Sequence, residues 1–379
     1  MWKLGKITAK THIGDYGQIV DSFVLLLKDT CCEEVKMTNG TDFILEKNYN
    51  DLTGKVNAKG VTEISICETE EGTEVELILD PFVYRYDFKV TGTIAGTEVS
   101  FTRADVDKVW IKDMDQFVAY EENGVHYRMY EPECMGKRPL VLFLHGGGEC
   151  GEDNELQLTG TLGALRLAER WSDMYIMAPQ APSGNLGMQE MFEVMKKRGN
   201  PFSADMGITP FSLKGERGWN RDYVAKVTDI IRKMISDGKP CLSYRHEYGR
   251  RRCASDNFSG TGLICGGGTD LSEHEWRKLC KSSSFTESSG MDHICLYGSP
   301  AQQTCVYSQC MQQAVAGRTD VKFTLYTQEE LAKYGIGTTE GLTSQELDAE
   351  NHNSWILALH NENGILDWMI SHQKNKEKC

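Results

Sequence analysis

The strongest constraint on the fold is an apolar run that ends abruptly in glycines. Residues Pro139 to Glu149 read Pro-Leu-Val-Leu-Phe-Leu-His-Gly-Gly-Gly-Glu. A continuous apolar run of this kind is typical of a parallel strand that is buried on both faces. Ligands of open α/β sheets bind at the carboxyl ends of such strands, which is where these glycines lie. The run therefore predicts a buried strand followed by a functional loop.

The glycines themselves suit the stabilisation of negative charge. Without side chains, residues of this loop can turn their backbone N–H groups toward a developing oxyanion. We therefore interpret Gly146, Gly147 and Gly148 as an oxyanion hole. The alternative interpretation is a glycine-rich turn between a strand and a helix with no chemistry, because short motifs also arise by chance.

Composition and charge limit the classes of partner. The chain has 379 residues, enough for two or three domains, and a formal net charge of -14. This charge argues against nucleic acid and against anionic membrane surfaces. No apolar run reaches the length of a membrane span, and the first residues lack the apolar core of a secretion signal. We therefore expect a cytoplasmic protein without a nucleic-acid or membrane partner.

The cysteines do not indicate a metal site. The chain has 13 cysteines, and more than half of them lie between residues 241 and 310. No pair in that stretch has the C-x-x-C spacing of a zinc site, and disulfides are not expected without a secretion signal. We expect neither a metal nor an organic cofactor. The cysteines of this stretch are Cys241, Cys253, Cys265, Cys280, Cys295, Cys305 and Cys310.

Residues 1–122 predict a small all-β sandwich domain. Short apolar or alternating runs, such as Phe23–Leu27, Glu63–Cys67 and Val75–Leu79, are separated by polar turns. Strands at this spacing are typical of a β-sandwich. Because fold does not dictate function, its role is open between packing, pocket shaping and assembly of a homo-oligomer.

Residues 123–379 predict a second domain in which strands alternate with helices. This alternation implies a parallel, doubly wound α/β sheet. The helix expected at Asp222–Ile235 has its apolar residues on one face, as an amphipathic helix requires. The other elements expected are strands at Tyr127–Tyr130, Leu140–Leu144, Met174–Ala178 and Val321–Leu325, and helices at Gly160–Trp171 and Glu362–His372.

Taken in order, several motifs resemble one family. Tyr-Glu-Pro-Glu follows the β-rich segment, then come the glycine motif, a strand ending in Ala-Pro-Gln-Ala-Pro, Gly218-Trp219-Asn220 and a late His-Asn-Ser-Trp. This series resembles α/β-hydrolase carboxylesterases of the esterase/phospholipase type with an N-terminal immunoglobulin-like domain. The resemblance spans most of the chain except residues 240–310. It implies a serine-type carboxylic ester hydrolase that acts on a small-molecule ester without a cofactor.

The resemblance also implies a serine nucleophile, an acid and a histidine, in that order along the chain. His352 matches the histidine and would be the general base, in a polar loop after the last strand; an exposed loop histidine without a role is the alternative. No G-x-S-x-G pentapeptide occurs, and Glu247 and Tyr248 stand where the nucleophile is expected. The acid is not identified, because no Asp occurs between Asp292 and Asp320.

A shift of reading frame would explain the missing serine. Residues Pro240 to Gly249 place a proline and several charges where a buried central strand belongs. One permitted coding of this segment, read one base later, gives Arg-Val-Tyr-Leu-Thr-Gly-Met-Ser-Met-Gly. The serine would then straddle the codons of Glu247 and Tyr248. The hypothesis is that residues 240–262 and about 282–312 are translated out of frame.

Two other functions remain open at this point. A peptidase of the prolyl-oligopeptidase type would share the fold and the triad, although 120 residues are too few for its propeller. A non-catalytic binding protein would keep a pocket and His352 but no nucleophile. Smaller features carry less weight: Trp219 and Trp355 either line an acyl pocket or simply pack, and Glu149, Asp153 and Glu155 are expected in a solvated acidic loop.

Overall fold

A computed structural model describes the chain as two compact units. The first comprises Met1–Gln116 with Thr159–Leu162, and the second comprises Phe117–Leu158 with Gly163–Cys379. The first unit ends before the boundary predicted at residue 122, because the strand at 117–122 pairs within the second unit. The residues described are 2–35, 43–48, 60–85, 87–133, 138–182, 219, 221–236, 243–247, 260–264, 291–297, 321–342, 347, 350–362, 364 and 366–367.

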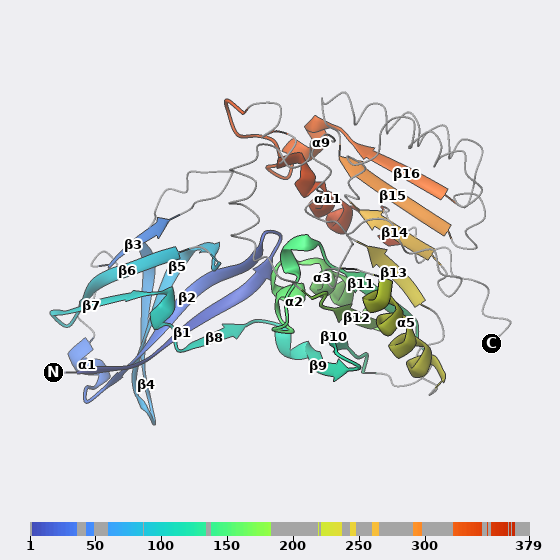
Figure 1. Cartoon of the computed structure of the whole chain (residues 1–379). Helices are drawn as coiled ribbons and strands as arrows, with labels where there is room; N and C mark the ends of the chain where they lie inside the picture. Colours follow the sequence, from blue (N-terminus) through green and yellow to red (C-terminus); the bar gives the residue numbers. More distant parts are fainter. Residues whose placement is uncertain are drawn as a thin grey trace, which may run out of the picture. The chain divides into compact units, whose positions relative to one another are not determined.

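The first unit consists of two antiparallel-rich sheets. A five-stranded sheet has the order β4-β5-β2-β1-β8, and a three-stranded sheet has the order β3-β6-β7 (Figure 1). The strands are β1 (Lys3–Gly14), β2 (Gly17–Lys28), β3 (Phe43–Asn48), β4 (Val61–Thr69), β5 (Gly72–Val83), β6 (Asp87–Ile94), β7 (Thr97–Thr102) and β8 (Lys108–Ile111). The short helix α1 (Cys32–Val35) and two 3-10 turns, Arg103–Asp105 and Met114–Gln116, complete the unit.

One hydrophobic core joins the two sheets of the first unit. Alternate residues of each strand point inward, so that Ala9, Phe23 and Val90 are each 0% exposed and belong to a single cluster. The ring of Phe23 lies 5.1 Å from the ring centroids of both Phe88 and Phe101, which come from the three-stranded sheet. Period-two alternation in the sequence thus produces two sheets that share their inner faces.

The second unit is built on one eight-stranded sheet of order β16-β15-β14-β13-β11-β12-β10-β9. Six of these strands, from β12 to β16 along the sheet, are parallel to one another, whereas β10 pairs antiparallel with both β12 and the edge strand β9. The strands are β9 (Phe117–Glu122), β10 (Val125–Tyr130), β11 (Leu140–Leu144), β12 (Tyr175–Pro179), β13 (Ser243–Glu247), β14 (Gly260–Ile264), β15 (Met291–Tyr297) and β16 (Val321–Tyr326).

The helices of the second unit pack on this sheet. One face of α5 (Arg221–Ser236) contributes Tyr223, Val227, Ile230 and Ile231 to the same cluster as the inward residues of β10, β11 and β12. The predicted helix at 222–235 is therefore confirmed, whereas the one expected at 160–171 begins later. The other helical segments are α2 (Leu156–Thr159), α3 (Gly163–Arg170), α9 (Gln328–Ala332), α11 (Trp355–His360) and the 3-10 turns Gly147–Glu149 and His352–Ser354. Most of the helix expected at 362–372 lies outside the described residues.

The order of the strands creates a switch point at β11. The chain passes from β11 to β12 on one side and then, through α5, to β13 on the other side (Figure 1). In open α/β sheets, ligands bind at the carboxyl ends of the strands at such a point. The fold therefore places the candidate site at the carboxyl ends of β11 and β13.

The central position of β13 corrects one expectation. Residues 243–247 pair with β11 on one side and β14 on the other, although their sequence does not predict a central strand. Residues 291–297 lie inside the second segment that the hypothesis places out of frame, about 282–312. They pair with both β14 and β16. The physical reason is that ladder pairing uses backbone N–H and C=O groups, which these residues all carry whatever their side chains.

Within the described part of the chain, no helix is long and apolar enough to cross a membrane.

Candidate functional site

The carboxyl ends of β11 and β13 lie side by side. The register runs in parallel from Leu140 opposite Ser243 to Leu144 opposite Glu247. Glu247 therefore ends its strand beside the residue that precedes His145 and the glycines. The backbone of Glu247, where the nucleophile is expected, therefore lies next to the start of the glycine loop. Tyr248 lies outside the described residues.

The glycine loop begins as an extended chain and then tightens. Gly146 is buried and extended, with φ -77° and ψ -177°, and it caps the 3-10 turn Gly147–Glu149. Gly148 is exposed, its backbone is outside the left-handed region, and no described atom lies within 4 Å of a Cβ built on it. Neither backbone conformation nor packing against described residues demands glycine at 148.

His145 connects the loop to the strand end at β12. Its side chain is 0% exposed, and its Nε2 accepts a hydrogen bond of 2.9 Å from the backbone N–H of Ala181. Because Nε2 accepts, the proton is on Nδ1, which donates to the carbonyl of Gly146 at 2.6 Å. Burial lowers the pKa of His145 from 6.5 to about 4. The imidazole is therefore neutral near pH 7 and has a structural place in the loop.

Trp219 holds His145 from the other side. Its indole Nε1 donates to the carbonyl of His145 at 2.9 Å, and the two ring centroids are 4.9 Å apart. The Trp219 indole therefore packs against His145 and is hydrogen-bonded to its backbone. Trp355 is also buried, with 7% of its surface exposed.

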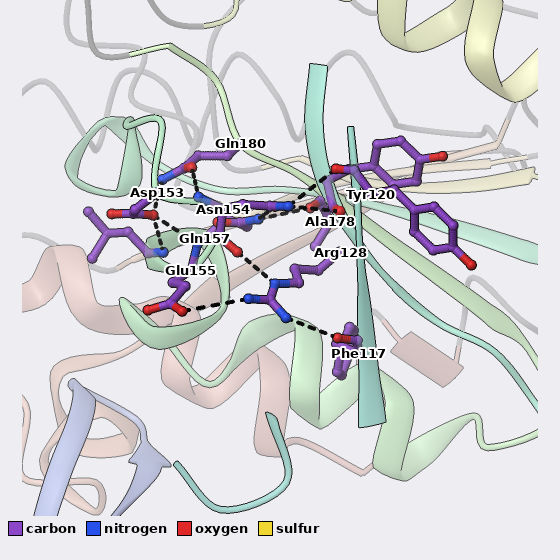
Figure 2. A network of polar contacts seen from close by, with 11 residues as sticks. Phe117, Tyr120, Arg128, Asp153, Asn154, Glu155, Gln157, Ala178 and Gln180 are labelled. Atoms are coloured by element: carbon purple, nitrogen blue, oxygen red, sulfur yellow. Dashed lines mark hydrogen bonds and ion pairs between the residues drawn. The ribbon is translucent and has the colours of Figure 1, made fainter. Parts of the chain in front are cut away.

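A network of polar contacts joins the segment that follows the glycine loop to the sheet (Figure 2). Gln180, which follows β12, donates from Nε2 to the carbonyl of Glu149 at 3.3 Å and to Asp153 Oδ1 at 2.8 Å. Its Oε1 accepts from the backbone N–H of Asn154 at 2.7 Å. Arg128, on β10, donates from Nε to the carbonyl of Asn154 at 2.7 Å. The segment after the glycines is thus fixed to two strands of the sheet.

The expected solvated acidic loop is only partly solvated. Glu155 is exposed, but the Glu149 side chain is only 14% exposed and approaches His145 Nδ1 at 3.8 Å. Asp153 accepts from the N–H groups of Glu155 and Leu156 at 2.8 and 2.9 Å, at the start of α2. Although burial acts to raise the pKa of Asp153, these bonds and the one from Gln180 lower it. Asp153 is therefore a charged cap within the network.

The polar segment that carries His352 follows β16 and α9 and leads into α11. His352 begins the 3-10 turn His352–Ser354, which leads directly into α11 and lies beside β15. The preceding residue, Asn351, is 0% exposed and donates from Nδ2 to Gln328 Oε1 at 2.8 Å. Asn351 and Ser354 are thus buried polar residues near His352, and the hydrogen bond to Gln328 in α9 helps to offset the burial of Asn351. The position of His352 is known from its backbone.

Sequence reasoning did not identify Asn154, Gln180, Gln328 or Asn351 as parts of the site. Only Asn154 carries a local signal, because its φ of +56° is a conformation that Asn tolerates better than most residues. The described residues contain no group of three His, Cys, Asp or Glu that could hold a metal ion. Cys31, Cys32, Cys67 and Cys150 form no disulfide among the described residues, and the side chains of the 241–310 cysteines lie outside them.

Comparison with known proteins establishes the fold alone. No protein-family model matches this sequence, and no curated protein matches it. A crystal structure of a thermostable esterase superposes with a TM-score of 0.57 at 17% identity, covering 98% of this chain and 100% of that one. An acylaminoacyl peptidase from Pyrococcus horikoshii gives a TM-score of 0.33 at 11% identity, covering 96% of this chain and 70% of that one. The chain has a mixed α/β fold of the α/β-hydrolase type.

Proposed function

We propose that this protein is a serine-type carboxylic ester hydrolase that acts on a small-molecule ester through an acyl-enzyme. The register between β11 and β13 carries the proposal, since it sets Glu247 opposite Leu144 at the switch point. A nucleophile after β13 and oxyanion donors after β11 would then face the same carbonyl. The similar esterase structure supports this choice of reaction.

In the first half of the reaction, the serine oxygen attacks the ester carbonyl carbon while His352 takes the hydroxyl proton. Backbone N–H groups of the Gly146–Gly148 loop, with that of the residue after the nucleophile, hold the oxyanion. The carbon–oxygen bond to the alcohol breaks, and His352 returns the proton to the leaving alcohol. In the second half, His352 activates water, which releases the acid and restores the serine.

The nucleophile requires a restored reading frame. As the chain stands, Glu247 and Tyr248 occupy the slot, and a carboxylate there would repel the developing oxyanion. We infer that residues 240–262 and about 282–312 are out of frame, and that the second zone hides the acid of the triad. The central place of β13 supports the inference, because in one permitted coding a one-base shift turns this segment into Arg-Val-Tyr-Leu-Thr, which suits a buried strand better, followed by a Gly-Met-Ser-Met-Gly turn. Sequencing the gene across residues 236–315 tests it, and an uninterrupted frame would refute it.

We also infer that the two units are separate domains, an immunoglobulin-like β-sandwich and a hydrolase domain. The separate hydrophobic cores support this, and no catalytic residue falls in the first unit. A chain that begins at Phe117 should still unfold cooperatively, whereas one that begins at Val125 loses β9 and should be less stable. Sedimentation of the full and shortened chains would show whether the first unit carries self-association, since a homo-oligomer should dissociate on its removal.

A fluorophosphonate probe tests the enzyme class. The chain with the restored frame should be labelled and should hydrolyse a nitrophenyl ester, because only an activated serine reacts with the probe. A matched variant with the new serine replaced by alanine should do neither. Ester binding without labelling would indicate a non-catalytic binding protein. Cleavage of peptides in preference to esters would indicate a peptidase.

A further inference from the structure

Gln180 is a fully hydrogen-bonded residue of the polar network that holds the segment after the glycine loop. It is 1% exposed, and all four of its polar groups have partners. Its backbone N–H donates to the carbonyl of His126 in β10 at 2.9 Å, and its carbonyl accepts from the hydroxyl of Tyr223 in α5. Its side-chain amide makes the bonds to Glu149, Asp153 and Asn154 described above. The residue is therefore fixed to the sheet while its side chain holds the loop.

The side-chain amide of Gln180 is hydrogen-bonded to both ends of the segment from Glu149 to Asn154. Nε2 holds Glu149, the last residue of the 3-10 turn, while Oε1 holds Asn154, just before α2. Between them, Gly151 lies so close that a Cβ there would approach Gln180 Nε2 to 2.6 Å. Gly151 also donates to the carbonyl of Ala181 at 2.9 Å. A change in the amide would consequently move the turn that presents Gly147 and Gly148.

Asn154 completes the arrangement with a strained backbone. Its φ of +56° lies in the left-handed region, which costs energy for a residue other than glycine. Its Nδ2 donates to the carbonyls of Tyr120 and Tyr127 at 3.2 and 3.4 Å, and its Oδ1 accepts from Gln157 at 2.7 Å. Such strain persists only where the surroundings fix the conformation, and here Gln180 and Arg128 help to fix it.

We propose that Gln180 is a positioning residue for the oxyanion loop, holding the 147–149 turn through Glu149 and Asp153. The inference rests on the proposed ester hydrolase function. Oxyanion donors act only when they are held at the correct distance, and a misplacement of about 1 Å costs on the order of a hundredfold in rate. Gln180 touches no substrate. Its effect passes through the loop.

The decisive variant is Gln180→Glu, which keeps the size and shape of the side chain. It replaces the donor at Nε2 with an oxygen that faces two acceptors, the Glu149 carbonyl and Asp153. Gln180→Met removes the hydrogen bonds without adding charge. The matched control is Gln116→Glu, because Gln116 Nε2 also donates to an aspartate, Asp113 Oδ1 at 3.0 Å, in an exposed turn far from the loop in sequence.

Two measurements on the full chain with the restored frame test the proposal. In Gln180→Glu, kcat per probe-labelled site should fall by about 10- to 100-fold while KM changes by less than about threefold. Hydrogen exchange of the 145–154 amides should become faster in the same variant. Gln180→Met should show the same pattern more weakly, and Gln116→Glu should show neither change.

The outcomes separate this proposal from the proposed function. Unchanged kcat per labelled site and unchanged exchange in Gln180→Glu would overturn the positioning role. Loss of folded protein with normal kcat per labelled site would also overturn it, because it would indicate a purely structural residue. If the parent chain is neither labelled nor active, the ester hydrolase proposal fails. The exchange measurement would then still show whether Gln180 holds the loop.

Discussion

Two neighbouring strands of one sheet, β11 and β13, reach the same architecture from opposite kinds of sequence. β11 reads Leu-Val-Leu-Phe-Leu and is buried at every position. β13 reads Ser-Tyr-Arg-His-Glu, yet its backbone pairs with β11 in parallel over its full length. The first strand is recognisable from its residues, and the second only from its neighbours.

The comparison distinguishes the pairing of a strand, which the backbone can supply, from the chemistry at the end of the strand, which depends on the side chains there. Backbone groups alone can complete a ladder, so polar residues can be paired into a central strand. The end of β11 carries glycines and a neutral histidine held by Ala181. The end of β13 carries Glu247, which cannot act as the serine that the proposed function requires. The predictions that follow test this contrast.

Restoring the frame at β13 should have the largest effect. Loss of a triad member leaves only a residual rate, so the restored chain should exceed the present one by roughly 10³-fold or more in kcat/KM. Hydrolysis of a nitrophenyl ester measures this, with His352→Ala of the restored chain as the control. Efficient hydrolysis by the present chain that survives His352→Ala would refute both the triad assignment and the frame hypothesis.

Truncation in β11 should destabilise the fold strongly. Leu142 is 3% exposed and packs in the core of the second unit, so Leu142→Ala should cost about 2–5 kcal/mol of unfolding free energy. Arg245, its partner in β13, gives the matched variant Arg245→Ala, which should cost much less if that strand contributes mainly backbone pairing. Urea denaturation measures both. Equal costs would contradict the contrast between the strands.

Lowering the pH should decrease the stability of the fold, because His145 at the end of β11 is buried in its neutral form. The folded-state pKa is about 4, below the ordinary value of 6.5, so the unfolded chain binds the extra proton first. Stability is then complete above pH 6.5 and is lost as the pH falls from there toward 4, by roughly 3 kcal/mol. Urea midpoints at several pH values measure this loss. His145→Gln, whose amide can still accept from Ala181, should have a flatter pH dependence in that window, and an unchanged slope would exclude His145 as its cause.

Side chains added to the glycine loop should slow catalysis without unfolding the protein. Gly147→Val in the restored chain should lower kcat by about 100-fold, the scale for losing one oxyanion donor. Gly148→Val is the companion variant, because the described structure leaves room for a side chain there. Its melting temperature should be unchanged while its kcat falls. Normal turnover of a nitrophenyl ester by both variants would mean that the glycines form only a turn.

Local patterns in the sequence determined much of the second unit. The five apolar residues of β11 and the one-sided helix α5 lie close to their predicted positions, because burial leaves a periodicity that can be read within one segment. The His-Gly-Gly-Gly loop begins directly after β11, where the apolar run predicted the end of the strand. In the first unit, the runs named from the sequence at Phe23–Leu27, Glu63–Cys67 and Val75–Leu79 lie within β2, β4 and β5.

Only the tertiary structure decided which polar groups meet. Gln180 bonds to Asn154 and Glu149 across 26 and 31 residues, and Asn351 bonds to Gln328 across 23. Nothing in the local sequence marks such partners, because a hydrogen bond depends on the position and direction of two groups that folding brings together. The burial that keeps His145 neutral likewise exists only in the folded chain. The apolar pattern within a segment predicts which of its residues are buried, whereas polar side chains find their hydrogen-bond partners only when folding brings distant segments together.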